Sequence, residues 1–262
     1  MRRAARTTTD APLAARALAF DAGIFERGAD RVLRVGDATV LLTPSLPSVA
    51  HLNFVHVHAP LDASRVEALA HEHHSGLPSL RVVVDDPAHS ERFAAELRAR
   101  GWAVHQLVFM SRDGTAEPPT TAALAEEVPY GHVRGLREEW LRAGDWALEG
   151  DQLEATLEGD ARLFAGTPPR AFAIFETGRP IAYALLLTDG RDGAVEDVYT
   201  TPSARGRGLA TAAVAAVLHA ARSERCEAVF VATAGEGGAS GLYERLGFTR
   251  VVVQHHFGRP AR

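Results

Sequence analysis

The spacing of apolar and polar positions divides the first half of the chain into alternating helices and strands. Helical spacing predicts helices over residues 11–27, from Asp62 to about residue 74, and from Pro87 to the glycine at 101. Short runs rich in β-branched and aromatic residues predict strands. These strands cover residues 31–34, 39–42, 51–58, 80–84 and 102–110.

The second half of the chain repeats this order of elements. Helices are predicted over 132–144, 151–157, 206–223 and 238–246, and strands over 171–176, 181–188, 194–200, 226–233 and 248–257. The pieces 98–102 and 244–248 take the same place in the two halves, which indicates an internal duplication. Residues 111–123 contain Gly114, Pro118 and Pro119 and read as a linker. We therefore expect an α/β fold with two domains, 1–115 and 122–262.

Composition narrows the class of protein. Of the 262 residues, 46% are hydrophobic and 23% are charged, as in globular proteins. The formal net charge of −5 argues against a nucleic-acid partner. No apolar run approaches the ~18 residues of a membrane span, and no apolar signal core follows Met1, so we expect a cytoplasmic protein without a membrane partner. The single cysteine, Cys226, lies in an apolar strand and is predicted to be part of the core.

Candidate chemistry is concentrated between residues 195 and 221. A predicted strand is followed by Arg205-Gly206-Arg207-Gly208-Leu209-Ala210, and a helix follows directly. A helix N-terminus offers free N–H groups and a positive dipole end, which together favour a phosphate or pyrophosphate. The turn is not a dinucleotide fingerprint, because Thr211 replaces its third glycine, and it is not a P-loop, because the chain has no lysine. The plain alternative is a basic loop that caps an ordinary helix.

A second stretch, Ala239 to Phe248, makes the pattern more specific. With it, the sequence resembles the GNAT superfamily of acyl-CoA-dependent N-acyltransferases over about residues 125–257. The cofactor motif of that superfamily, Arg/Gln-x-x-Gly-x-Gly/Ala, is matched by Arg205, Gly208 and Ala210. Its later motif is matched by Ala239, Leu242, Tyr243, Leu246, Gly247 and Phe248. The resemblance implies two tandem GNAT-like domains, of which the first lacks the cofactor motif.

The resemblance also implies site residues. The pantetheine arm of acetyl-CoA would pair with the strand segment Val198, Tyr199 and Thr200, and the pyrophosphate would meet Arg205 and the N–H groups of Gly206, Arg207, Gly208, Leu209, Ala210 and Thr211. Tyr243 matches the tyrosine that protonates the leaving thiolate; the alternative is a packed aromatic residue. Glu196 is the candidate general base, and a β-bulge would bring in Asp197 instead. A surface carboxylate is the alternative for Glu196. The asparagine that the family often has before this tyrosine is replaced by Glu236.

The function implied is an N-acetyltransferase that moves an acetyl group from acetyl-CoA to a primary amine of a small molecule or peptide. The alternative is a non-catalytic, acyl-CoA-binding regulatory protein. We expect no metal, because only His71 and His74 of the run 71–74 share a helical face. In the first half, the segment 59–66 has no glycine turn and contains Pro60, so we expect no CoA there. A homodimer is left open.

Overall fold

The computed structural model describes residues 11–59, 61–74, 76–85, 87–144, 147–235 and 239–260; for residues 87–90, 92 and 93 it describes the backbone alone. The sequence features at Pro60 and Glu236 lie outside these ranges. The chain divides into two compact units. The first consists of residues up to Ser111 together with Thr233–Ser240 and Thr249–Arg262, and the second of Arg112–Ala232 and Gly241–Phe248.

The first unit is a mixed sheet with helices on both faces. In chain order its elements are α1 (Ala11–Gly28), β1 (Arg31–Val35), β2 (Ala38–Leu42), a 3-10 turn (Ala50–Leu52), β3 (Phe54–Val57), α2 (Ala63–His74), β4 (Ser79–Val84), α3 (Pro87–Ala99), β5 (Ala103–Asp113, of which the last two residues belong to the second unit) and β11 (Thr249–Pro260). The sheet order is β1-β2-β3-β4-β11-β5. β3 and β4 are parallel, whereas β11 is antiparallel to both β4 and β5.

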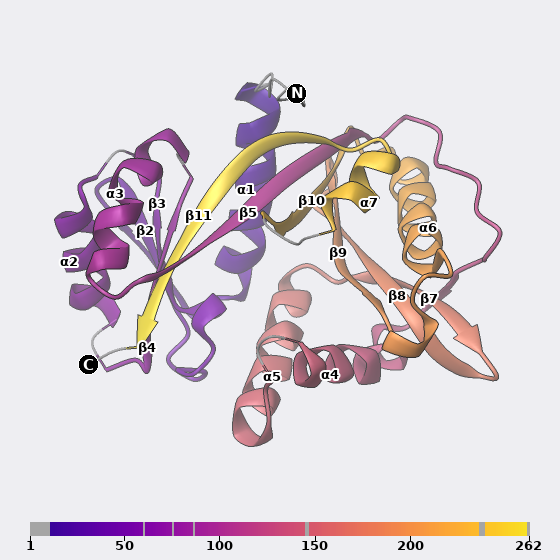
Figure 1. Ribbon diagram of the computed structural model, residues 1–262, viewed down its shortest axis with the longest axis horizontal. Coiled ribbons are helices and arrows are strands. Elements are labelled where there is room, and N and C mark those ends of the chain that lie inside the picture. Colours follow the sequence, from indigo (N-terminus) through magenta and orange to yellow (C-terminus); the bar gives the residue numbers. More distant parts are fainter. Residues whose placement is uncertain are drawn as a thin grey trace. The chain divides into compact units, whose positions relative to one another are not determined.

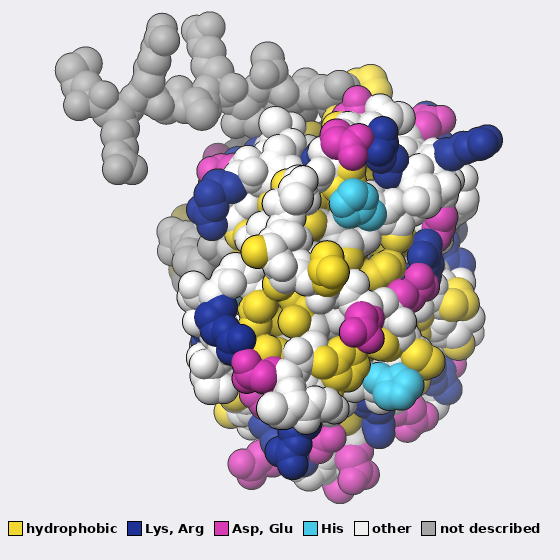
Figure 2. Space-filling model, turned by 90° about the vertical axis from the view of Figure 1, so that its right-hand side faces the viewer, with side chains coloured by type: hydrophobic (Ala, Val, Ile, Leu, Met, Phe, Trp, Pro, Cys, Tyr) yellow, Lys and Arg dark blue, Asp and Glu magenta, His cyan; other side chains and the backbone are white. Residues whose placement is uncertain are grey.

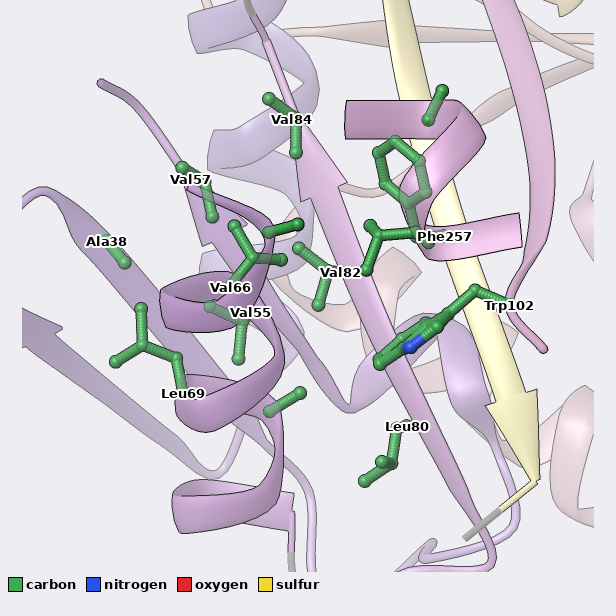
Figure 3. Packing of buried hydrophobic residues seen from close by; sticks show 14 of the residues in the cluster. Ala38, Val55, Val57, Val66, Leu69, Leu80, Val82, Val84, Trp102 and Phe257 are labelled. Atoms are coloured by element: carbon green, nitrogen blue, oxygen red, sulfur yellow. The ribbon is translucent and has the colours of Figure 1, made fainter. Parts of the chain in front are cut away.

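The alternation of side chains along β3 and β4 separates two cores. Val55 and Val57 of β3 join Val82 and Val84 of β4 under α2 and α3, with Trp102 and Phe257 at the same core (Figure 3). The intervening positions, Phe54 and Val83, face the other side and pack with Phe25 of α1. The ring of Phe25 meets that of Phe54 edge-on at 5.6 Å. Both faces of the sheet are therefore covered.

The C-terminal strand belongs to the first unit. β11 lies between β4 and β5, and it pairs His255 with Val84 on one side and with Gln106 on the other (Figure 1). This differs from the predicted boundaries, which assign everything from residue 122 to the second domain. Period-2 alternation in residues 248–257 shows that a strand forms there, but it carries no information about which sheet the strand enters.

The second unit is built around a meander that ends in a strand–helix–strand unit. Its elements are β6 (Glu126–Val128), a 3-10 turn (Tyr130–His132), α4 (Arg134–Ala143), α5 (Gly150–Gly166), β7 (Arg170–Glu176), β8 (Arg179–Thr188), β9 (Gly193–Thr200), a 3-10 turn (Pro202–Ala204), α6 (Leu209–Ser223), β10 (Ala228–Ala234, of which the last two residues belong to the first unit) and α7 (Ser240–Arg245). The order β10-β9-β8-β7-β6 is antiparallel except for the parallel pair β9–β10.

Most predicted elements are confirmed, and the differences include the following three. The predicted strand 51–58 begins as a 3-10 turn, because the Asn53 side chain bonds to the N–H of Thr43 and to the carbonyls of Leu46 and Val49. α5 extends to Gly166, well past the predicted end, and β6 was not predicted. Cys226 is buried as predicted, and burial raises the pKa of its thiol to about 11. Among the described helices, none is both long and apolar enough to cross a bilayer.

Candidate functional site

The glycine turn between β9 and α6 is held open by backbone conformation. Gly206 and Gly208 have φ angles of +79° and +77°, in the left-handed region that glycine adopts at little cost. A Cβ added at either position would meet nothing within 4 Å. The glycines are therefore required for the path of the chain and not for lack of space. The same angles explain why α6 begins at Leu209 and not at 206 as predicted.

The start of α6 presents free donors. Gly208 is the N-cap residue and makes no side-chain capping bond, and the first bond of the helix runs from the N–H of Ala212 to the carbonyl of Gly208. The N–H groups of Leu209, Ala210 and Thr211 precede this bond and have no acceptor in the helix. Such a helix end has the donors and the dipole to bind an anion.

The two arginines of the turn differ in their partners. Nε of Arg205 donates to the carbonyl of Thr200 at 3.2 Å, which ties the turn back to the end of β9. Arg207 forms an ion pair with Glu176 at 2.7 Å, with both side chains about half exposed. Because exposed ion pairs contribute little, Arg207 can exchange Glu176 for a more strongly charged ligand.

One edge of β9 is available along most of its length. β9 pairs with β10 only through Gly193 and Ala194, and no further pair joins these strands in the described part of the chain. Backbone groups beyond Ala194 therefore face β10 without a ladder partner. The hydroxyls of Thr200 and Thr201, which follow on this strand, are buried and make no hydrogen bond within the protein. An extended polar ligand along this edge would satisfy groups that are otherwise unpaired.

A β-bulge interrupts β9 beside this edge. Glu196 pairs with Leu185 and Tyr199 with Tyr183, so that one residue of β8 opposes both Asp197 and Val198. Asp197 has a φ of +50°. In a regular strand residues 196 and 199 would point to opposite faces, but the extra residue brings Glu196 and Tyr199 to the same face. The strand is therefore not regular at this point, and the bulge that the sequence left open as an alternative is present.

The bulge places the Asp197 carboxylate in a charged network with α4 and α5. Its Oδ1 lies 3.2 Å from Arg137, and Arg137 also binds Asp160 at 2.8 Å. The Asp197 side chain is 13% exposed. Burial raises the pKa of Asp197 to about 6, against the opposing attraction of Arg137. Nothing in the sequence pairs positions 137, 160 and 197, so this network was not predicted.

The Tyr199 side chain contacts residues of α4, whereas Val198 is only partly buried. The Tyr199 hydroxyl donates to Oε1 of Glu139 at 2.9 Å, and its ring stacks on Trp140 with centroids 5.9 Å apart. The guanidinium of Arg137 lies over the ring of Trp140, 4.9 Å from the ring centroid. Val198 is partly buried. The Tyr199 side chain is thus committed to packing against α4, and only its backbone remains for a ligand.

Tyr243 lies within reach of the charge of Glu196. It is buried on α7, and its ring meets that of Phe248 at 5.7 Å. Burial, and secondarily the charge of Glu196, raises the pKa of the Tyr243 phenol far above its usual value. The phenol therefore keeps its proton throughout the ordinary pH range and acts as a donor. The fold brings together two residues that are 47 positions apart in the sequence (243 minus 196).

A cavity of about 520 Å³ lies elsewhere in the second unit. Its lining includes Leu124, Phe172, Ala212, Ala216 and His219. Figure 2 shows hydrophobic side chains gathered in a shallow hollow on the side of the molecule where Figure 1 draws α6. None of the predicted site residues lines this cavity, and it has few charged groups. We therefore place the candidate site at the turn and at the open edge of β9.

The comparisons with known proteins match the part of the chain that contains these residues. Residues 125–248 match the model of the acetyltransferase (GNAT) family. The chain carries a GNAT-family domain. This segment contains the glycine turn, the bulged strand and Tyr243. No curated protein sequence matches the chain.

Solved structures extend the likeness of the fold to almost the whole chain. A GCN5-related N-acetyltransferase from Kribbella flavida is 22% identical, with a TM-score of 0.64 and 98% of each chain covered. A tandem GNAT protein from the clavulanic acid biosynthesis pathway is 16% identical, with a TM-score of 0.57 over 97% of this chain and 96% of that one. A functionally unknown protein from Staphylococcus epidermidis is 10% identical, with a TM-score of 0.69 over 89% and 95%. The mixed α/β fold of GNAT proteins is confirmed.

Proposed function

We propose that this GNAT-family protein is an N-acetyltransferase that uses acetyl-CoA and a primary amine of a small molecule or peptide. The observation that carries the proposal is the combination of an uncapped α6 start, two left-handed glycines and an unpaired edge of β9. The turn from Arg205 to Thr211 would hold the pyrophosphate, and the backbone of Val198–Thr200 would hold the extended arm. Bound acetyl-CoA supplies an acyl group that is already activated as a thioester.

Residues of the chain would handle the two protons of the reaction. A C–N bond forms, the C–S bond breaks, the amine loses one proton, and the departing thiolate gains one. Glu196 is partly buried, its charge acts on Tyr243, and it would accept the proton from the amine. Tyr243 would donate to the sulfur. Asp197 is held by Arg137 and would keep the bulge that aims Glu196.

A turnover assay tests this proposal. The purified chain is given acetyl-CoA and a panel of small primary amines, amino acids and peptides, and the release of free CoA thiol is followed. Amine-dependent release above the rate of hydrolysis supports an enzyme. CoA binding by calorimetry without release for any amine in the panel would instead indicate a non-catalytic acyl-CoA-binding protein, and absence of CoA binding would contradict both.

A further inference from the structure

Two histidines and an aspartate converge at the ends of two parallel strands in the first unit. His56 lies in β3 and His58 follows that strand, and Asp85 follows β4 directly. In the parallel pair β3–β4, Val57 lies opposite Val84. His58 follows Val57 and Asp85 follows Val84, so these two residues come at the same end of the strand pair. His56 and His58 are two positions apart and share one face of the strand. No motif in the sequence marks these three residues as a group.

The distances among these side chains are in the range of a metal site. Nε2 of His56 lies 2.7 Å from Oδ1 of Asp85, and Nδ1 of His58 lies 3.4 Å from Oδ2. One ligand atom from each residue can be chosen so that all three lie within 4.8 Å of one another. Ligands about 2.0–2.2 Å from a tetrahedral zinc ion lie about 3.3 Å apart, so the His58–Asp85 contact already fits such an ion and the His56–Asp85 contact must widen.

The surrounding residues fix the orientation of two of these ligands. Nε2 of His58 is 2.8 Å from the hydroxyl of Thr39, which leaves Nδ1 directed at Asp85. The Gln254 amide donates to Oδ1 of Asp85 at 2.7 Å. Such partners behind the ligands are typical of metal sites, where they set the tautomer and hold the side chains in place.

The charge balance of Asp85 favours a cation. Its side chain is 18% exposed, and its hydrogen-bond partners are two imidazoles and an amide, none of which carries a permanent positive charge. Arg81 is connected only indirectly, because it donates to Nδ1 of His256, whose Nε2 donates to Gln254. Buried carboxylates are normally paired with a charge or bind a metal.

The location matches that of the ligand site in the second unit. There, β9, α6 and the parallel strand β10 form a strand–helix–strand unit, and the candidate site follows β9. In the first unit β3, α2 and β4 form the same kind of unit, and the His–His–Asp cluster follows β3. Ligands of open α/β sheets bind at the carboxyl ends of parallel strands. The cluster therefore occupies the corresponding end of the first sheet.

We propose that His56, His58 and Asp85 bind one divalent transition-metal ion of the zinc class. Two imidazole nitrogens and one carboxylate oxygen suit zinc and its neighbours better than calcium or magnesium, which prefer oxygen ligands alone. The side chain of His58 is 41% exposed, so an ion can enter from solvent and keep a water molecule as its fourth ligand. The proposal does not depend on the acetyltransferase function of the second unit.

Metal titration of the untagged full chain tests this inference. After treatment with a chelator, the protein is titrated with Zn²⁺ in a calorimeter, and with Co²⁺ while the visible absorption is recorded. We expect one ion per chain and a Co²⁺ spectrum of four-coordinate type. His58→Ala removes one of the three protein ligands and should weaken binding by at least about 10- to 100-fold, the loss typical of removing even a residue that only supports a ligand. Because His58 is partly exposed, this variant should fold, which circular dichroism verifies.

A matched control separates this cluster from other surface histidines. His71 is an exposed residue of α2 whose Nε2 lies 2.6 Å from Arg259, and it belongs to the run 71–74. His71→Ala should bind Zn²⁺ as the wild type does. Absence of Zn²⁺ binding by the wild type, unchanged affinity in His58→Ala, or loss of binding in His71→Ala would each overturn the proposal.

Discussion

The backbone carbonyls of Leu97 and Tyr243 accept equivalent hydrogen bonds, each at the end of a helix in one of the two units. The N–H of Trp102 donates to Leu97, and the N–H of Phe248 donates to Tyr243, each at 3.0 Å. Each bond spans a left-handed glycine, with φ of +84° at Gly101 and +86° at Gly247. The first unit thus repeats the helix end but has leucine where the second unit has the phenol.

This relationship predicts one CoA per chain. The first unit has leucine in place of Tyr243 and therefore lacks the hydroxyl. Its helix α2 begins at Ala63, and the carboxylate of the preceding Asp62 accepts a hydrogen bond from the N–H of Arg65 at 2.7 Å. A helix start that is already capped by a carboxylate repels a pyrophosphate. Equilibrium dialysis should give a stoichiometry of one. Two equivalents would contradict the assignment of a single site.

A negative charge at the glycine turn should weaken CoA binding. Gly208 has a φ of +77°, so any side chain there is strained. Asparagine and aspartate tolerate this left-handed region better than most other residues. Gly208→Asp and Gly208→Asn therefore share the strain and differ in charge. Calorimetry should show that CoA binds the aspartate variant about 10-fold more weakly than the asparagine variant. Equal affinities would mean that no phosphate lies at this helix start.

Removal of one hydroxyl tests the proposed acid. Tyr243→Phe keeps the ring that packs on Phe248 and removes only the phenolic proton. We expect kcat to fall by about 10- to 1000-fold while CoA affinity stays within error, since the loss affects the transition state alone. Wild-type turnover of the folded variant would show that the phenol has only a packing role.

The buried carboxylate of Asp197 predicts a pH dependence of stability. Its pKa in the folded state, about 6, lies above the value of an unfolded aspartate, so the folded protein binds the extra proton between about pH 4 and 6. The stability contributed by this proton is therefore lost as pH rises. Relative to Asp197→Asn, the free energy of unfolding of the wild type should fall by about 1–3 kcal/mol between pH 4 and 6.5. Chemical denaturation at several pH values measures this difference; a rise would mean that Arg137 outweighs burial.

A glycine in the predicted linker 111–123, Gly114, predicts a steric effect on stability. A Cβ on Gly114 would lie 2.0 Å from the carbonyl oxygen of Cys226, whereas a Cβ on Gly131 would meet nothing within 4 Å. Gly114→Ala should lower the free energy of unfolding by about 1–3 kcal/mol. Gly131→Ala, the matched control, should stay within about 0.5 kcal/mol of the wild type. Similar losses in both variants would point to a general cost of replacing glycine.

Local signals explain which parts of the fold were predictable. The strands at 171–176 and 181–188 were found because β-branched and apolar side chains mark a buried strand within a few residues. The end of α5 was missed because helix length depends on which face packs, here through Phe164, which packs on the cluster that contains Val133 and Leu136. The destination of β11 was missed because strand pairing is not encoded in the alternation of one strand.

By itself, the sequence determined the glycine turn of the GNAT-family domain, the helix that follows it and the position of Tyr243 in a second motif. These features follow from backbone preferences and from contiguous residues. Only the tertiary structure decided that β9 is bulged at Asp197, that Arg137 and Asp160 approach from other helices, and that His56, His58 and Asp85 meet at one sheet end. Distances between residues far apart in the chain depend on strand pairing and side-chain packing, and no short stretch of sequence contains them.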